Sequence, residues 1–154
     1  MNEVEKLIRE YLGSTKMLQI ASSNDQQPWI CTVYYAYDDD LSIYWISTPD
    51  SRHSKEIMKN PKVAAAIAFS QEPYPKDGVR GLQLEGVAEL LKGEDEERAS
   101  KLYVNQLMRE KTLLEDTRSG KNPHKFYRIR PSMFVLFDSV NFPEESRQEW
   151  RVKI

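Results

Sequence analysis

The sequence predicts a mainly β protein of the α+β class: an antiparallel barrel, closed or split, of about six strands with flanking helices. Runs of strand length recur along the chain, and polar turns such as the aspartates at 38–40 join them. Most of these strands would pair in sequence order, and curling such a sheet protects its edges. Glycines at 81 and 86 interrupt the longest alternating run, as the bends of a barrel require.

The strand-like runs alternate apolar and polar residues, are rich in β-branched and aromatic residues, or are nearly continuous apolar runs of strand length. In chain order they are 17–22, 29–37, 41–47, 62–69, 79–91, 125–130 and 133–137. The runs 29–37 and 41–47 flank a short polar turn, so we expect them to form a hairpin. Residues 70–78 contain prolines and a glycine and predict a loop.

Helices are expected at three places. Residues 4–12 carry apolar side chains at the spacing of an amphipathic helix. A short helix is predicted over 52–59, because the Asn-Pro pair at 60–61 stops it. The acidic run that begins at 94 favours a helix N-terminus, and the helix continues through 107. Residues 115–123 are polar and predict a loop.

Length and composition limit the classes of protein. The 154 residues suit one domain, 1–154. A net charge of −2 gives no sign of a nucleic-acid partner. No apolar run reaches the ~18 residues that span a bilayer, and charges within 3–10 interrupt any signal-peptide core. With Cys31 as the single cysteine, we expect a cytoplasmic protein without a disulfide or a membrane partner.

Common catalytic and metal-binding motifs are absent from the sequence. The two histidines and the cysteine lack the spacing of metal ligands, so no metal site is expected. Neither a G-x-G-x-x-G motif nor a G-x-x-x-x-G-K phosphate loop occurs. No side chain stands out as a general acid or base, and the catalytic residues are therefore unassigned.

Residues 47–55, which leave a strand and enter a helix, form the most informative segment. It combines hydroxyls, basic side chains and the free N–H groups of a helix start. These side chains are Ser47, Thr48, Ser51, Ser54, Arg52, His53 and Lys55. A phosphate monoester binds to donors and positive charge of this kind. The alternative is a capped surface helix with solvated charges.

Two stretches resemble the pyridoxamine 5'-phosphate oxidases and their relatives. The first matches the S-R-K-x-x-x-I/L-x-x-N-P-x-V segment through Ser51, Arg52, Ile57, Asn60, Pro61 and Val63. The second, residues 81–90, is similar to a family strand with a glutamine, a glycine, a small residue and a glutamate. The resemblance covers residues 15–91. It implies a six-stranded antiparallel split barrel with flanking helices that holds FMN at a homodimer interface.

The resemblance also implies roles around the FMN phosphate. Arg52 would contact the phosphate, while Ser47 and Thr48 would donate hydrogen bonds near it. Ile46 would lie beside them at the strand end. His53 replaces the lysine of the oxidases. Because a histidine can be neutral at pH 7, phosphate affinity would be lower or depend on pH.

Other implied roles concern the flavin ring and the ribityl chain. Thr32, Val33 and Tyr34 would line the flavin-side strand. Gln83 would bond the flavin or the ribityl chain from the second subunit. The alternative for Gln83 is an outward-facing polar strand residue.

The resemblance implies an FMN-dependent oxidoreductase that acts on an unknown small molecule. Residues 147–154 do not match the substrate-binding Arg and His of the pyridoxamine oxidases, which argues against pyridoxamine phosphate as the substrate. Trp150 would cover the flavin or anchor the tail, and anchoring is favoured. The alternative functions are a non-catalytic flavin, deazaflavin or haem binding module and a barrel with an empty site.

Overall fold

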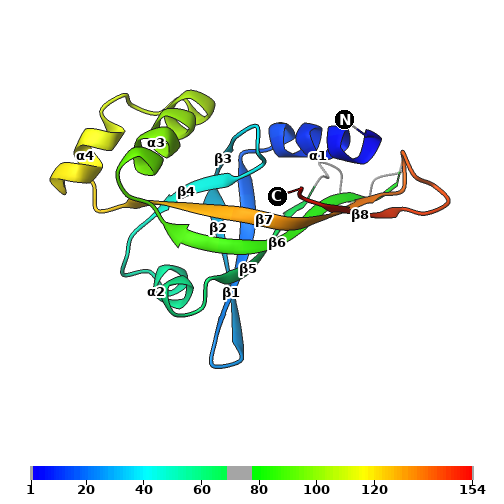
Figure 1. Cartoon of the computed structure of the whole chain (residues 1–154), viewed down its shortest axis with the longest axis horizontal. Helices are drawn as coiled ribbons and strands as arrows, with labels where there is room; N and C mark the ends of the chain where they lie inside the picture. Colours follow the sequence, from blue (N-terminus) through cyan, green and yellow to red (C-terminus); the bar gives the residue numbers. More distant parts are fainter. Residues whose placement is uncertain (1, 69–77, 154) are drawn as a thin grey trace.

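The computed structural model describes residues 2–68 and 78–153. Within these residues one antiparallel sheet of eight strands curls into a half-barrel, and four helices flank it (Figure 1). The α+β split-barrel class is confirmed, with a sheet larger than the six strands expected. Phe69 and most of the predicted loop 70–78 lie outside the described residues. No helix in the described ranges is long and apolar enough to cross a membrane.

The helices are α1 (Glu3–Ser14), α2 (Arg52–Lys59), α3 (Glu94–Leu107) and α4 (Leu113–Ser119). The strands are β1 (Met17–Asn24), β2 (Gln27–Tyr34), β3 (Ala36–Tyr37), β4 (Ile43–Ser47), β5 (Lys62–Ala68), β6 (Arg80–Leu90), β7 (Lys125–Asp138) and β8 (Arg147–Arg151). The strand order is β2-β1-β5-β6-β7-β4-β3, and β8 pairs with β7 beyond this path.

Tyr35 lies between the two ends of the sheet. It separates β2 from β3, which are the terminal strands of the main path. Its backbone N–H donates to Lys16 O at 3.0 Å, and its buried hydroxyl donates to Leu12 O at 2.7 Å. The expected strand 29–37 is therefore broken, because Tyr35 turns towards α1. The expected hairpin is also wrong in part, since β2 pairs with β1 and only β3 pairs with β4.

The β6–β7 ladder contains a bulge between Glu85 and Gly86. A Cβ at Gly86 would collide with the Arg130 carbonyl oxygen and approach Pro131 Cα to 2.9 Å. The absence of a side chain lets the two strands stay paired through the bend. β7 therefore runs unbroken over the two strands expected at 125–130 and 133–137.

Two elements were missed by the sequence prediction. α4 occupies much of the expected loop 115–123, because Leu113 is buried and Arg118 donates to α3 through Glu96 at 3.0 Å. β8 lies in the charged tail, where Trp150 packs on Phe134 of β7 with ring centroids 6.1 Å apart. Trp150 thus anchors the tail to the sheet.

The hydrophobic core has two parts. Alternate residues of β1, β5 and β6 pack inside the half-barrel beneath α1, whereas α3 and α4 cover a second cluster around Tyr44 and Phe126. The opposite face of β2, β1, β5 and β6 exposes side chains such as Ile30, Ala64 and Gln83. This outer face is where the candidate site lies.

Candidate functional site

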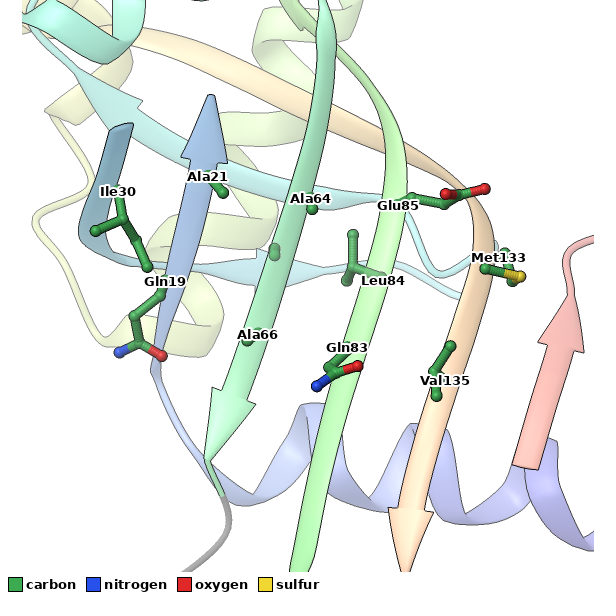
Figure 2. Close-up of a pocket in the computed structure, with 11 residues that line it drawn as sticks. Gln19, Ala21, Ile30, Ala64, Ala66, Gln83, Leu84, Glu85, Met133 and Val135 are labelled. Atoms are coloured by element: carbon green, nitrogen blue, oxygen red, sulfur yellow. The ribbon is translucent and has the colours of Figure 1, made fainter. Parts of the chain in front are cut away.

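A hollow of about 320 Å³ lies on the outer face of the sheet (Figure 2). Two rows of paired residues cross the strands there. One row is Ile30, Ala21, Ala64, Glu85 and Met133, and the other is Thr32, Gln19, Ala66, Gln83 and Val135. Alanines occupy the middle of both rows, so the floor of the hollow is low and apolar.

Polar groups in the hollow are few. The amides of Gln19 and Gln83 lie on either side of Ala66 in the second row (Figure 2). Glu85 is the single ionisable side chain among the lining residues that the structure describes. The hollow therefore suits a flat, largely apolar group that makes a small number of polar contacts at its edge.

The strand β2 divides the three predicted flavin-side residues between two faces. Thr32 and Tyr34 are exposed on the outer face, and Thr32 belongs to the row that crosses the hollow. Val33 points the other way and is buried in the barrel core. A ligand on the outer face could thus reach the side chains of Thr32 and Tyr34 but only the backbone of Val33. Gln83 lines the hollow, as an outward-facing strand residue.

The N-terminus of α2 gathers several hydroxyls around one imidazole. Ser51 caps the helix, accepting from Ser54 N at 3.3 Å and donating to Ser54 Oγ at 2.8 Å. His53 Nε2 lies 2.6 Å from Ser47 Oγ and 3.2 Å from Ser51 Oγ. We call these four residues the hydroxyl–imidazole cluster. Burial lowers the pKa of His53 below its ordinary value, although nearby Glu56 opposes the shift.

Thr48 and Ile46 lie at the margin of this cluster. Both side chains are half-buried. The Thr48 carbonyl accepts from Ser51 N at 3.1 Å in the turn that leads into α2. Ile46 packs against the second core cluster. The structure thus brings Ser47, Ser51 and His53 together and leaves Ile46 facing a different set of neighbours.

The Arg52 side chain contacts Glu56 and Trp29 instead of the hydroxyl–imidazole cluster. Its Nε donates to Glu56 Oε1 at 2.8 Å, and its guanidinium lies 4.1 Å from the ring centroid of Trp29 on β2. Glu56 also accepts from Ser22 at 2.6 Å, and its side chain is only 7% exposed. Hydrogen bonds from Ser22 and Arg52 lower the pKa of Glu56. Within residues 2–68 and 78–153, no hydrogen bond engages the two Nη nitrogens of Arg52.

The sequence model of the pyridoxamine 5'-phosphate oxidase family matches residues 4–135. That span covers both the hydroxyl–imidazole cluster and the strands of the hollow. The chain belongs to this family. Among the curated proteins, it is similar to a UPF0306 protein of Yersinia pestis, with 24% identity over 101 residues that cover 65% of this chain and 67% of the relative.

Solved structures share the fold of this family member. A haem-binding protein of Mycobacterium smegmatis superposes with a TM-score of 0.76 at 15% identity, covering 98% of this chain and 59% of that one. A FAD-binding protein of Mesorhizobium loti gives 0.63 at 21% identity, covering 87% and 90%. At these identities the likeness shows the fold alone.

Sequence reasoning missed two residues that contact Arg52. Glu56 and Trp29 hold Arg52, yet neither received a role. The i, i+4 spacing of Arg52 and Glu56 was a usable signal, because such pairs meet on a helix. Trp29 lies far from Arg52 in sequence, and only the fold shows their contact. Among the described residues, no group of three or more His, Cys, Asp or Glu side chains could hold a metal ion.

Proposed function

We propose that this member of the pyridoxamine 5'-phosphate oxidase family binds FMN at the interface of a homodimer and is a flavin-dependent oxidoreductase acting on a small molecule. The observation that carries the proposal is the first turn of α2. There, the segment that matches the family presents hydroxyls, an imidazole and helix N–H groups together. Arg52, which lies towards Glu56 and Trp29, keeps two Nη groups that make no hydrogen bond among the described residues. A phosphate monoester requires donors of this kind.

The residues present fit such a phosphate. Successive residues of a helix point about 100° apart, so the Arg52 and His53 side chains diverge at the start of α2. Ser47 and Ser51 supply hydroxyls on the His53 side. Arg52 supplies its two Nη groups on the other side, while Glu56 keeps the Nε end fixed. Part of the positive charge is already balanced by Glu56, which favours a moderate rather than a very tight phosphate contact.

The outer hollow fits the ring of the cofactor. Its alanine floor admits a flat group, and Gln83 and Gln19 offer amide donors and acceptors at its margin. When bound, FMN supplies the hydride and electron transfer. The side chains of this protein would bind and orient the ring, with Glu85 at the edge of the hollow.

A second copy of the chain is the proposed cover for this face. Ile30 is 60% exposed and Tyr34 is 57% exposed, although both are large and apolar in character. They extend the apolar floor made by Ala21, Ala64 and Ala66. Exposed apolar surface of this kind marks interaction sites. A homodimer would bury it and would also exclude water from the cofactor ring.

The alternative is a non-catalytic flavin, deazaflavin or haem binding module. The observation in its favour is the fold shared with the haem-binding protein of M. smegmatis. A haem iron usually needs an axial side chain such as histidine. Here His53 contacts the Ser47 hydroxyl, and His124 Nδ1 lies 2.7 Å from Asn122 Oδ1. Both arrangements fit a hydrogen-bonding role better than iron ligation.

Thermal unfolding with added ligands tests the proposal. FMN at 100 times its dissociation constant should stabilise the protein by about 2.7 kcal/mol. For a domain of this size, that is a rise in Tm of about 5–10 °C. Deazaflavin and haemin are the comparison ligands. A shift with haemin alone would favour the haem module, and no shift with either flavin would refute the flavin site.

A further inference from the structure

A separate cavity lies where α1, the turn between β3 and β4 and the C-terminal residues 150–153 meet (Figure 1). We call it the α1–tail cavity. Its volume is about 440 Å³, a size typical of small-molecule sites. None of its lining residues belongs to the outer hollow or to the hydroxyl–imidazole cluster. The charged and aromatic side chains that line it are Glu5, Arg9, Asp39, Asp40, Trp150 and Lys153.

Hydrogen bonds join the α1 wall of the cavity to the turn. The Arg9 guanidinium donates to Glu5 Oε1 and to the Asp39 carbonyl oxygen, both at 2.9 Å. Within the turn, the carboxylate of buried Asp38 accepts from Asp40 N at 3.0 Å. Both walls are therefore fixed before a ligand binds, which lowers the entropy cost of binding.

The C-terminal residues supply an aromatic wall. Trp150 packs on Phe134 of β7, and beyond it Val152 N donates to Ser132 O at 3.1 Å. These contacts hold the indole, which is half-buried, where it lines the cavity. The face of an indole attracts cations as well as apolar groups. This wall therefore suits a ligand that combines an apolar body with a positive charge.

The α1–tail cavity carries a net negative charge. Among the lining residues that the structure describes, three have carboxylates, Glu5, Asp39 and Asp40, and two have positive charges, Arg9 and Lys153. Glu5 and Arg9 offset each other, because their side chains form an ion pair at 2.9 Å. Two aspartates then remain against one lysine, so the cavity favours a cation over an anion.

The two aspartates keep most of their capacity to bind a cation. Within residues 2–68 and 78–153 the Asp39 carboxylate makes no hydrogen bond or ion pair, since Arg9 contacts only its backbone oxygen. Arg98 lies 3.8 Å from Asp40 but pairs more closely with Asp38, at 3.0 Å. The Asp40 side chain is 81% exposed, so water screens the longer contact. Both carboxylates can therefore accept charge-assisted hydrogen bonds from a ligand.

We propose that the α1–tail cavity binds a protonated organic amine, that is, an ammonium group on an apolar or aromatic body. The ammonium binds to the carboxylates of Asp39 and Asp40, and the body packs on Trp150. Such a ligand contacts α1, the turn and the C-terminal residues together, so its binding stabilises the folded chain. The proposal is independent of the flavin function, because the two sites share no lining residue.

Three probes that share a phenyl ring and differ in charge test the proposal. They are phenethylamine, a cation; phenylalanine, a zwitterion; and 3-phenylpropionate, an anion. Calorimetry on the full chain gives their affinities, and thermal unfolding gives the shift in Tm. We expect phenethylamine to bind at least about tenfold more tightly than 3-phenylpropionate, with phenylalanine between them, because hydrogen bonds between charged groups carry that much energy.

The variant Asp39→Asn/Asp40→Asn removes the two carboxylates that would bind the ammonium. Both residues are exposed, and Asp38, which holds the turn, is left intact. The matched control is Glu144→Gln/Glu145→Gln, which removes the same charge from exposed positions before β8. We expect the aspartate variant to weaken phenethylamine at least about tenfold and the control less than about twofold. Far-UV circular dichroism checks that both variants fold.

Several results would overturn the amine site. Equal affinities for the three probes, or tighter binding of phenylalanine or of 3-phenylpropionate, would contradict the choice of a cation. An unchanged affinity for phenethylamine in the folded aspartate variant would place the amine elsewhere. Equal losses in the aspartate variant and the control would show that only the net charge of the protein attracts the probe. Failure of phenethylamine to bind at millimolar concentration would likewise refute the proposal, whether or not FMN binds.

Discussion

Removing Arg52 should weaken FMN at least tenfold and leave riboflavin nearly unchanged. Riboflavin lacks the phosphate, so the ratio of the two affinities isolates the phosphate contact. A hydrogen bond to a charged group contributes about 1.5–3 kcal/mol, which corresponds to about 10- to 150-fold. The Arg52 side chain is 46% exposed and shares its charge with Glu56, so we expect the lower part of that range.

The choice of variant decides whether this result can be interpreted. Arg52→Ala alone leaves the buried Glu56 carboxylate with Ser22 as its remaining partner, and the loss of the ion pair would destabilise α2. The double variant Arg52→Ala/Glu56→Gln removes both charges together. Fluorescence titration at low and high salt gives the affinities, and far-UV circular dichroism checks the fold. An unchanged ratio of FMN to riboflavin affinity in a folded double variant would refute the phosphate role of Arg52.

Three further predictions concern stability and assembly. Gly86→Ala should destabilise the protein by about 1–3 kcal/mol, because the added Cβ would collide with the β7 backbone. Gly81→Ala is the control, since its Cβ would meet nothing closer than 3.6 Å. Equal Tm values for the two variants would contradict the close approach at the bulge. Burial lowers the pKa of His53 in the folded protein, so the imidazole of the unfolded chain binds a proton at a higher pH than that of the folded chain. The free energy of unfolding should therefore fall as the pH drops below about 6.5. His53→Gln should flatten this pH dependence in denaturant titrations, and an unchanged slope would count against it. Ala64→Arg should turn a dimer into an 18.0 kDa monomer by light scattering, whereas Met108→Arg should not, and a dimeric Ala64→Arg variant would place the interface elsewhere.

Much of the fold can be predicted from apolar residues that recur about every two positions in strands and about every 3.6 positions in helices. A near-continuous apolar run of strand length predicts β5, alternation predicts β6, and the apolar spacing of residues 4–12 predicts α1. The break at Tyr35 could not be predicted, because it depends on hydrogen bonds to Lys16 and Leu12 from another part of the chain. The register of β8 on β7 could not be predicted either, because it depends on pairing with a strand elsewhere in the sequence.

The candidate site was predictable to a similar extent. The segment 47–55 does bring Ser47, Ser51 and His53 together. Arg52, however, turns towards Trp29, a contact across sequence that only the folded hairpin creates. Strand geometry alone divides Thr32, Val33 and Tyr34 between two faces, because the side chains of consecutive strand residues point in opposite directions. Val33 accordingly points into the core.

The visible absorption spectrum of the purified protein, loaded with FMN and freed of the excess, tests the central claim most directly. We predict that the bands of an oxidised flavin stay with the protein at one flavin per chain, and that a reductant bleaches them. A colourless protein after the same treatment would contradict the proposal that this protein binds flavin.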